Sequence, residues 1–125
     1  MEQRSSFRDF DRAIADFEAV LRLDSNHTSA RTNIGNSFNN RGLEHFRSGN
    51  IDLAIDDLQT ALRYDPNGTN TSDNLFHLFN ERAILYADRG DFDRAIADAE
   101  AALRINPNSA TVRGNLEAFR RARGR

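Results

Sequence analysis

The sequence predicts an all-α protein made of stacked antiparallel helix pairs, with about six helices. Two observations support this. First, three segments align without gaps at a constant offset of 41 residues, namely 10–17, 51–58 and 92–99. Second, apolar residues within each segment recur at helical spacing, as in Ile51, Ile55, Leu58 and Leu62. Because about three periods fill the 125 residues, we expect one repeat array and a single domain over 1–125.

The first helix is expected over 6–23, with Ser6 as its N-cap. Its apolar stripe consists of Phe7, Phe10, Ile14, Phe17 and Leu21. Arg8 stands where the later repeats have glycine, so no turn divides this helix. We therefore interpret 6–27 as the second helix of a truncated first repeat. One side of such a helix is uncovered, which makes Phe7, Phe10 and Phe17 candidates for self-association. The alternative is that the chain is cut from a longer repeat array.

The second repeat, 28–67, is expected to hold helices over 29–47 and 51–64. Gly49 lies between them and suits a left-handed C-cap with a tight turn. Gly42 is a small residue at which a neighbouring helix can approach closely. Pro66 follows the second helix, and proline cannot continue a helix.

The third repeat, 68–108, follows the same plan, with helices expected over 72–88 and 92–105. Residues 68–74 are rich in turn formers, so we expect part of this segment to be a loop, with Thr71 or Ser72 as the N-cap. The remaining residues, 109–125, are expected to form an arginine-rich C-terminal capping helix over 109–122.

The unit of helix, glycine turn, helix and proline stop resembles the tetratricopeptide repeat family. In one repeat the resemblance is carried by Gly42, Gly49, Ala54, Leu58, Ala61 and Pro66. In the next it is carried by Ala83, Tyr86, Gly90, Phe92, Ala95, Ala102 and Pro107. The family period is about 34 residues, and the seven additional residues here are 28–34 and 68–74. The resemblance implies a right-handed superhelical α-solenoid whose first helices line a concave groove.

The resemblance also implies a non-catalytic protein–protein interaction module that holds an extended peptide or a partner helix in this groove. The chain has 13 asparagines, several of which recur at the repeat offset. An Asn amide can both donate to and accept from a peptide backbone. The predicted ligand-binding residues are Asn33, Asn36, Asn39, Asn40, Leu43, Asn74, His77, Asn80, Ile84 and Arg121. The alternatives are that these amides are solvated or brace the helices, and that the protein is a self-associating structural module.

Nothing in the sequence points to catalysis, a cofactor or a metal. The chain has no cysteine, and its three histidines lie far apart. No phosphate-binding, zinc-protease or nucleophile-elbow motif occurs. His45 is interpreted as a packing residue. Asp57 recurs as Asp16 and Asp98, which indicates a role in packing the repeats together.

The expected partner is a protein or peptide, with a homo-oligomer through the N-terminal helix as a further possibility. The net charge of −2 argues against nucleic acid. The arginines near the C-terminus suit a helix C-terminal end, where the helix dipole favours cations. No apolar stretch approaches the ~20 residues of a membrane span, and the polar start Met1–Arg4 is unlike a signal peptide. We therefore expect a cytoplasmic protein.

Overall fold

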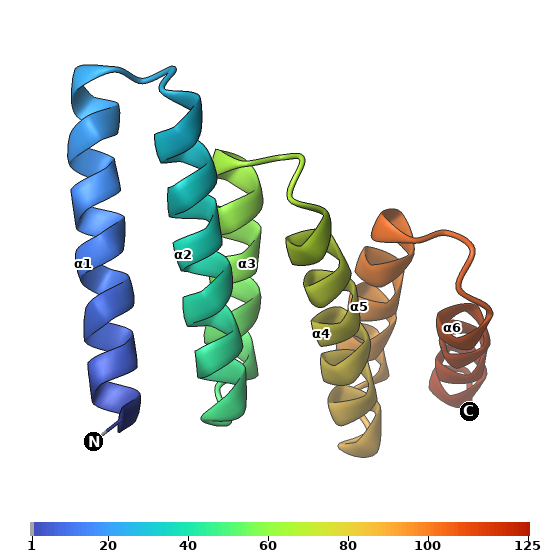
Figure 1. Cartoon of the computed structure of the whole chain (residues 1–125). Coiled ribbons are helices and arrows are strands. Elements are labelled where there is room, and N and C mark those ends of the chain that lie inside the picture. The colour runs from blue at the N-terminus through green and yellow to red at the C-terminus, as the bar shows by residue number, and fades with distance from the viewer. Residues whose placement is uncertain (1) are drawn as a thin grey trace. The chain divides into compact units, whose positions relative to one another are not determined.

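A computed structural model describes residues 2–125, with side chains from Phe7 onward. Over this range the chain forms six α-helices and no strand, which confirms the predicted all-α fold (Figure 1). The helices are α1 (Glu2–Leu23), α2 (Thr28–Arg47), α3 (Ile51–Tyr64), α4 (Thr69–Asp88), α5 (Phe92–Ile105) and α6 (Ala110–Arg123). The predicted bounds of α3 and α5 are confirmed at both ends.

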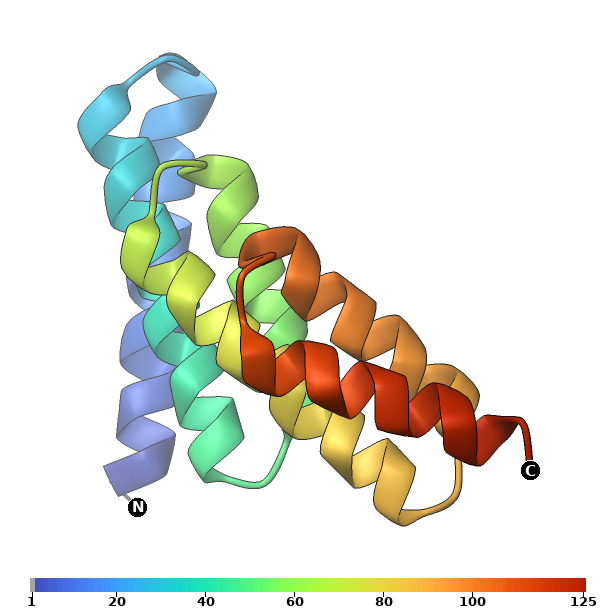
Figure 2. The ribbon, with the colours of Figure 1, turned by 90° about the vertical axis from the view of Figure 1, so that its right-hand side faces the viewer.

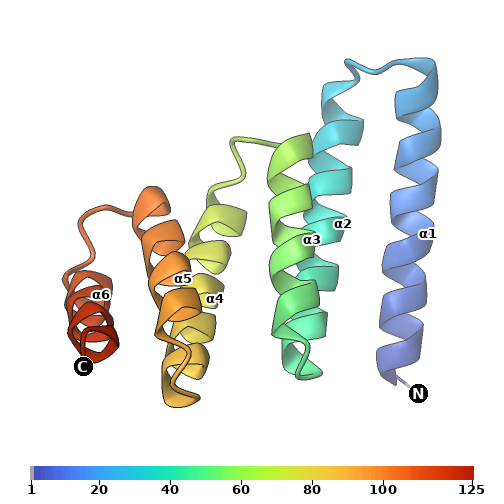
Figure 3. The ribbon, with the colours of Figure 1, turned by 180° about the vertical axis from the view of Figure 1, so that it is seen from behind.

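The chain divides into two compact units, which are described separately. The first extends to Ser72 and contains α1, α2, α3 and the first turn of α4. The second runs from Asp73 to Arg125 and contains the rest of α4 with α5 and α6. Within the first unit, α1 and α3 each pack against α2, and Figures 1 and 3 show these helices from opposite sides.

Gly42 determines how closely α2 and α3 approach. A Cβ placed on Gly42 would overlap the Leu58 side chain and would lie 3.0 Å from the Ala54 carbonyl oxygen. Leu58 and Ala54 are fully buried in α3. The glycine is therefore needed because any side chain would push the two backbones apart, as the sequence predicts.

The packing of α2 on its neighbours is fixed by Arg41. Its guanidinium donates two hydrogen bonds of 2.8 Å to the Asp57 carboxylate on α3 and one of 3.0 Å to Asp11 on α1. The hydrogen bonds to Asp57 raise the pKa of Arg41 above its ordinary value, so this guanidinium stays charged. His45 also packs here, with its ring stacked on Phe7 at 4.7 Å and its Nε2 3.7 Å from Asp57.

The second unit repeats this arrangement. Arg82 on α4 donates to both carboxylate oxygens of Asp98 on α5, at 2.8 and 2.9 Å. α5 buries Ala95, Ala99 and Ala102 completely, and α6 adds Val112. Figure 2 shows α6 running beside α5. Asp57 and Asp98 thus each form an ion pair between the two helices of one repeat, a partner that the sequence analysis did not identify.

Two predicted turn glycines are confirmed. Gly49 and Gly90 have φ of +91° and +80°, a conformation that L side chains rarely adopt. In each turn the next residue donates back to a helix carbonyl, Asn50 to His45 at 2.8 Å and Asp91 to Tyr86 at 2.9 Å. This closes the helix end and reverses the chain direction.

Two predicted helix starts are wrong. α1 begins at Glu2, so Ser6 lies within the helix and is not its N-cap. α4 begins at Thr69, so neither Thr71 nor Ser72 is a cap and most of 68–74 is helical. The reason for the second difference is that the Gly68 carbonyl accepts the first helical hydrogen bond, from Ser72 N at 3.0 Å, while Thr71 is buried. Packing here overrides the turn-forming composition.

Candidate interaction surfaces

Three predicted binding residues meet at one pocket of the first unit. Asn36, Asn39 and Asn40 of α2 line it from one side, and residues 68–71 line it from the other. Its volume is about 370 Å³. We call this site the amide pocket, and its lining residues are Asn36, Asn39, Asn40, Gly68, Thr69, Asn70 and Thr71.

The amide pocket is polar and uncharged. Its seven lining residues include four asparagines and two threonines, and none of them carries a formal charge. Asn36, Asn40 and Asn70 are exposed, while Thr71 is buried beneath them. Amide and hydroxyl groups both donate and accept hydrogen bonds, so this lining matches the alternating donors and acceptors of a peptide backbone.

The structure leaves two other α2 predictions outside this pocket. Asn33 is exposed and does not line it, although it lies on the same helix. Leu43 is half-buried and follows Asn39 and Asn40 by one helical turn. Leu43 therefore lies next to the pocket along α2. Asn33 is an asparagine of the same helix outside the pocket, so it can serve as a control for substitutions of the pocket asparagines.

The remaining predicted residues lie in the second unit. Asn80 accepts a hydrogen bond of 3.4 Å from Asn115 Nδ2, which joins α4 to α6. His77 is exposed, and its ring meets Phe76 edge-on at 5.3 Å. Ile84 is 38% exposed. Asn74 is half-buried in α4, and Arg121 is exposed on α6.

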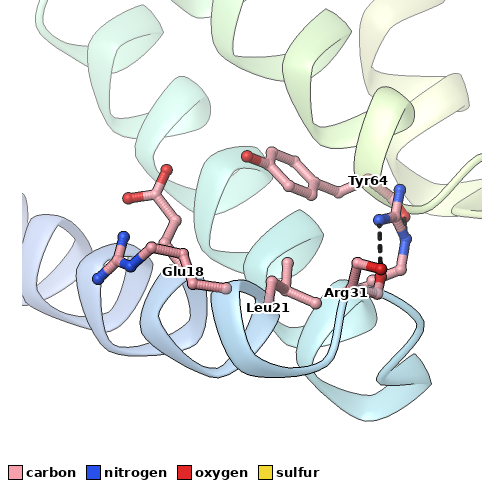
Figure 4. A pocket seen from close by; sticks show the side chains of 6 residues that line it. Glu18, Leu21, Arg31 and Tyr64 are labelled. Carbon is pink, nitrogen blue, oxygen red and sulfur yellow. Dashed lines mark hydrogen bonds between the residues drawn. The ribbon is translucent and has the colours of Figure 1, made fainter.

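A second pocket of the first unit lies where the ends of α1, α2 and α3 meet (Figure 4). It has a volume of about 320 Å³ and is lined by Glu18, Leu21, Arg22, Ser25, Arg31 and Tyr64. Figure 4 shows the Tyr64 ring and the Glu18 side chain on opposite sides of the opening. Sequence reasoning missed this site because its residues come from three separate helix ends.

Arg31 in this second pocket already has partners. Its guanidinium donates to the carbonyl oxygens of Tyr64 at 3.2 Å and Arg63 at 3.3 Å, and it lies over the Tyr64 ring. These carbonyls belong to the last turn of α3, where a cation is favoured by the helix dipole. Arg31 therefore caps α3, and the pocket is largely a consequence of that cap.

One face of α1 differs from the matching faces of α3 and α5. We define the open face as Ala13, Asp16, Phe17 and Val20. The matching residues of α3 are Ala54, Asp57, Leu58 and Ala61, and all of them are buried against α2. On α1, by contrast, Asp16 is exposed and Val20 is 37% exposed, while Ala13 and Phe17 are half-buried. Leu23, which matches Tyr64, is 92% exposed. In the described structure, α1 therefore has no helix covering this side.

Of the three phenylalanines predicted for self-association, only Phe17 belongs to the open face. Phe7 stacks on His45 of α2, so its ring is already engaged within the unit. Phe10 and Phe17 are both half-buried, but Phe10 corresponds to the half-buried Ile51 at the start of α3, whereas Phe17 corresponds to the fully buried Leu58. The uncovered surface of α1 is thus shifted from the predicted stripe toward Asp16 and Val20.

The wall of the amide pocket formed by residues 68–71 was also missed by sequence reasoning. The available signal was the asparagine-rich segment after Pro66, which composition alone assigns to a loop.

Within the described residues, no group of three or more His, Asp or Glu side chains is arranged to hold a metal ion. The helices described here include none with the length and apolar character needed to cross a membrane.

Comparison with known proteins gives one family. The sequence model of the tetratricopeptide repeat matches residues 35–67 and 76–109, just over half of the chain. None of the curated proteins matches the chain. Among solved structures, the chain is similar to one titled "Crystal structure of MamA protein", with a TM-score of 0.44 and 19% identity. That match covers 98% of this chain and 78% of the other.

Proposed function

The chain belongs to the tetratricopeptide repeat family, and from this premise we propose that it is a non-catalytic interaction module that binds an extended peptide at the amide pocket. The observation that carries the proposal is the meeting of Asn36, Asn39 and Asn40 with residues 68–71 around one cavity. The function is to hold a partner protein through a short segment of its chain.

The chemistry of the lining supports a neutral peptide backbone as the ligand. An acidic peptide would need guanidinium or ammonium groups, and the lining has none. Asparagines at 36 and 40 lie one helical turn apart, so their amides can contact neighbouring peptide groups. Leu43, the next half-buried residue along this face, would contact an apolar side chain of the peptide. His77, Ile84 and Arg121 are the exposed candidate contacts of the second unit.

The test is a screen of uncharged extended decapeptides for binding, followed by titration of the tightest binder. We expect the double variant Asn36→Ala with Asn40→Ala to raise the Kd at least about tenfold, because two hydrogen-bonding side chains are lost. The matched control is Asn33→Ala, an exposed asparagine of the same helix outside the lining, which is expected to leave the Kd unchanged.

A second arm tests whether the backbone is the group that is bound. Methylating the peptide nitrogens one at a time removes single donors, and at least one position should weaken binding markedly. Equal Kd values for the methylated and unmethylated peptides, or for the double variant and the wild type, would refute binding at this pocket.

A second candidate function is self-association through the open face of α1. It is favoured by the contrast between exposed Asp16 and its buried counterparts Asp57 and Asp98. Phe17 is half-buried and Val20 is 37% exposed, so covering them would contribute only part of the ~1.5–3 kcal/mol that burial of a fully exposed apolar side chain gives. Sedimentation equilibrium across a wide concentration range tests this function, and a monomer at every concentration would refute it.

A further inference from the structure

Arginine recurs at the 41-residue offset in three helices. Arg41 on α2, Arg82 on α4 and Arg123 on α6 occupy the same repeat position, and each is followed by a small residue, Gly42, Ala83 and Gly124. In the first two helices this arginine binds an aspartate 16 residues later, which lies on the second helix of the same repeat. α6 is therefore a first helix by this criterion, and the described residues contain no second helix for it.

Arg123 makes one half of the contacts that Arg41 makes. Arg41 binds Asp11 on the preceding helix and Asp57 on the following one. Arg123 donates to Asp93 at 3.4 Å, and Asp93 corresponds to Asp11 by repeat position. No described residue occupies the position that Asp57 has beside Arg41.

Asp16 on α1 occupies the aspartate position of the same arginine–aspartate pair. It corresponds to Asp57 and Asp98, but it is exposed and has no hydrogen bond or ion pair with any side chain that the structure describes. Among the residues that the structure describes, α1 is thus a second helix with no arginine paired to Asp16, and α6 is a first helix with no second aspartate paired to Arg123. The two incomplete sites are complementary.

We propose that α6 of one copy of this chain docks on the open face of α1 of a second copy, with Arg123 donating to Asp16. The docked pair takes the geometry of α2 on α3, in which Arg41 donates to Asp57. This inference rests on the proposed self-association and names both surfaces of the contact.

The α6 surface available for this contact follows from α2. The residues of α2 that contact α3 include Arg31, Gly35, Phe38, Arg41 and Gly42. The matching residues of α6 are Arg113, Glu117, Arg120, Arg123 and Gly124, and all of them are exposed. The backbone therefore lies open at Gly124, opposite the position where the second copy would bring Phe17, as Gly42 lies opposite Leu58.

The charges of the two surfaces also match. The α6 surface has three arginines and one glutamate. Arg120 and Arg123 form exposed ion pairs with Glu100 and Asp93 of α5, at 3.1 and 3.4 Å, so part of this positive charge is already compensated. The α1 surface has two exposed acids two helical turns apart, Asp9 and Asp16, and the exposed Asp24 follows directly after the end of the helix. Opposite charges of this kind favour the docking of α6 on α1 over α1 on α1 or α6 on α6.

Because the contact joins two different surfaces, it does not close on itself as a twofold dimer does. The weight-average mass in sedimentation equilibrium should therefore rise beyond that of a dimer as concentration increases. Asp16→Arg and Arg123→Asp should each raise the Kd of association at least about thirtyfold, since each places like charges at the contact. Arg104→Asp makes the same charge change at an exposed position of the neighbouring helix α5, outside the contact surface, and should leave the Kd within about twofold.

The decisive measurement is the mixture of the two variants. Asp16→Arg chains and Arg123→Asp chains should each stay monomeric alone and associate when mixed, because every contact in the mixture again joins opposite charges. This rescue also shows that both variants are folded. If the mixture stays monomeric while the wild type associates, self-association survives but this interface is refuted. If Arg123→Asp associates like the wild type, α1 binds some other surface. A wild type that is monomeric at every concentration would refute both the proposed self-association and this interface.

Discussion

Arg41 and Arg82 hold neighbouring helices together through paired hydrogen bonds to one carboxylate each. The side chains of Asp57 and Asp98 are about 90% removed from solvent, so their charges depend on the arginine for compensation. Sequence recurrence alone predicted a structural role for Asp57. It could not identify the partner, because an arginine 16 residues earlier becomes adjacent only when the helices fold back.

The two aspartates Asp57 and Asp16 provide a matched test at the residue scale. Asp57→Ala should lower the free energy of unfolding by about 2–3 kcal/mol, since it leaves Arg41 partly buried without its main acceptor. Asp16→Ala should change it by less than about 0.5 kcal/mol, because the carboxylate is exposed. Urea denaturation at low protein concentration measures both. Equal effects would show that the ion pair does not stabilise the fold.

Glycines 42 and 114 offer the same comparison for packing. Gly42→Ala should destabilise the protein by about 1–2 kcal/mol, because the new Cβ overlaps Leu58 in a dense core. Gly114→Ala should stabilise it by about 0.5–1 kcal/mol, since Gly114 lies within α6 with open space around it and alanine favours helix. Thermal unfolding followed by circular dichroism checks both signs. Stabilisation by both substitutions would contradict the close approach at Gly42.

At the scale of elements, the sequence predicted the bounds of α3 and α5 fully and those of α1 and α4 only in part. α3 and α5 lie between a glycine turn and a proline stop, so local chemistry defines both ends. The start of α4 has turn-forming residues, and burial of Thr71 decides in favour of helix. The amide pocket was half predicted for the same reason: α2 periodicity identified its asparagines, and the wall at 68–71 depended on that helix start.

The turn between α2 and α3 depends on a backbone conformation at Gly49. Gly49→Ala should cost about 1 kcal/mol of stability, because φ is +91° even though no atom would obstruct the new Cβ. Gly49→Asn should cost less, since asparagine tolerates the left-handed region better. Comparison of the two midpoints of urea denaturation tests this. A stable Gly49→Ala variant would mean that the turn can adopt another conformation.

For the whole molecule, the repeat predicts that surfaces at equivalent positions have equivalent partners. α1 and α6 are the helices in which the described structure leaves such positions uncovered, and their charges are opposite. The sequence alone indicated an uncovered helix at α1. It could not show which residues lie on the uncovered side, because Phe7 packs on His45 only in the folded unit.

The charge complementarity of these surfaces predicts a salt effect. Raising the salt concentration from about 0.05 M to about 0.5 M should weaken self-association several-fold, because screening reduces attraction between arginines and aspartates. Light scattering of the wild type in a NaCl series provides the measurement. Association that strengthens with salt would instead indicate an apolar contact and would contradict a role for Arg123 and Asp16.

The position of Arg41 between Asp11 and Asp57 has a consequence for how the first unit comes apart. A single guanidinium joins three helices, so detaching α1 also removes a hydrogen bond from the group that secures α2 to α3. Detachment of α1 therefore lowers the barrier to the separation of α2 from α3. Proteolytic cleavage within α1 should accordingly be followed by faster digestion of α2, with few long-lived fragments in between.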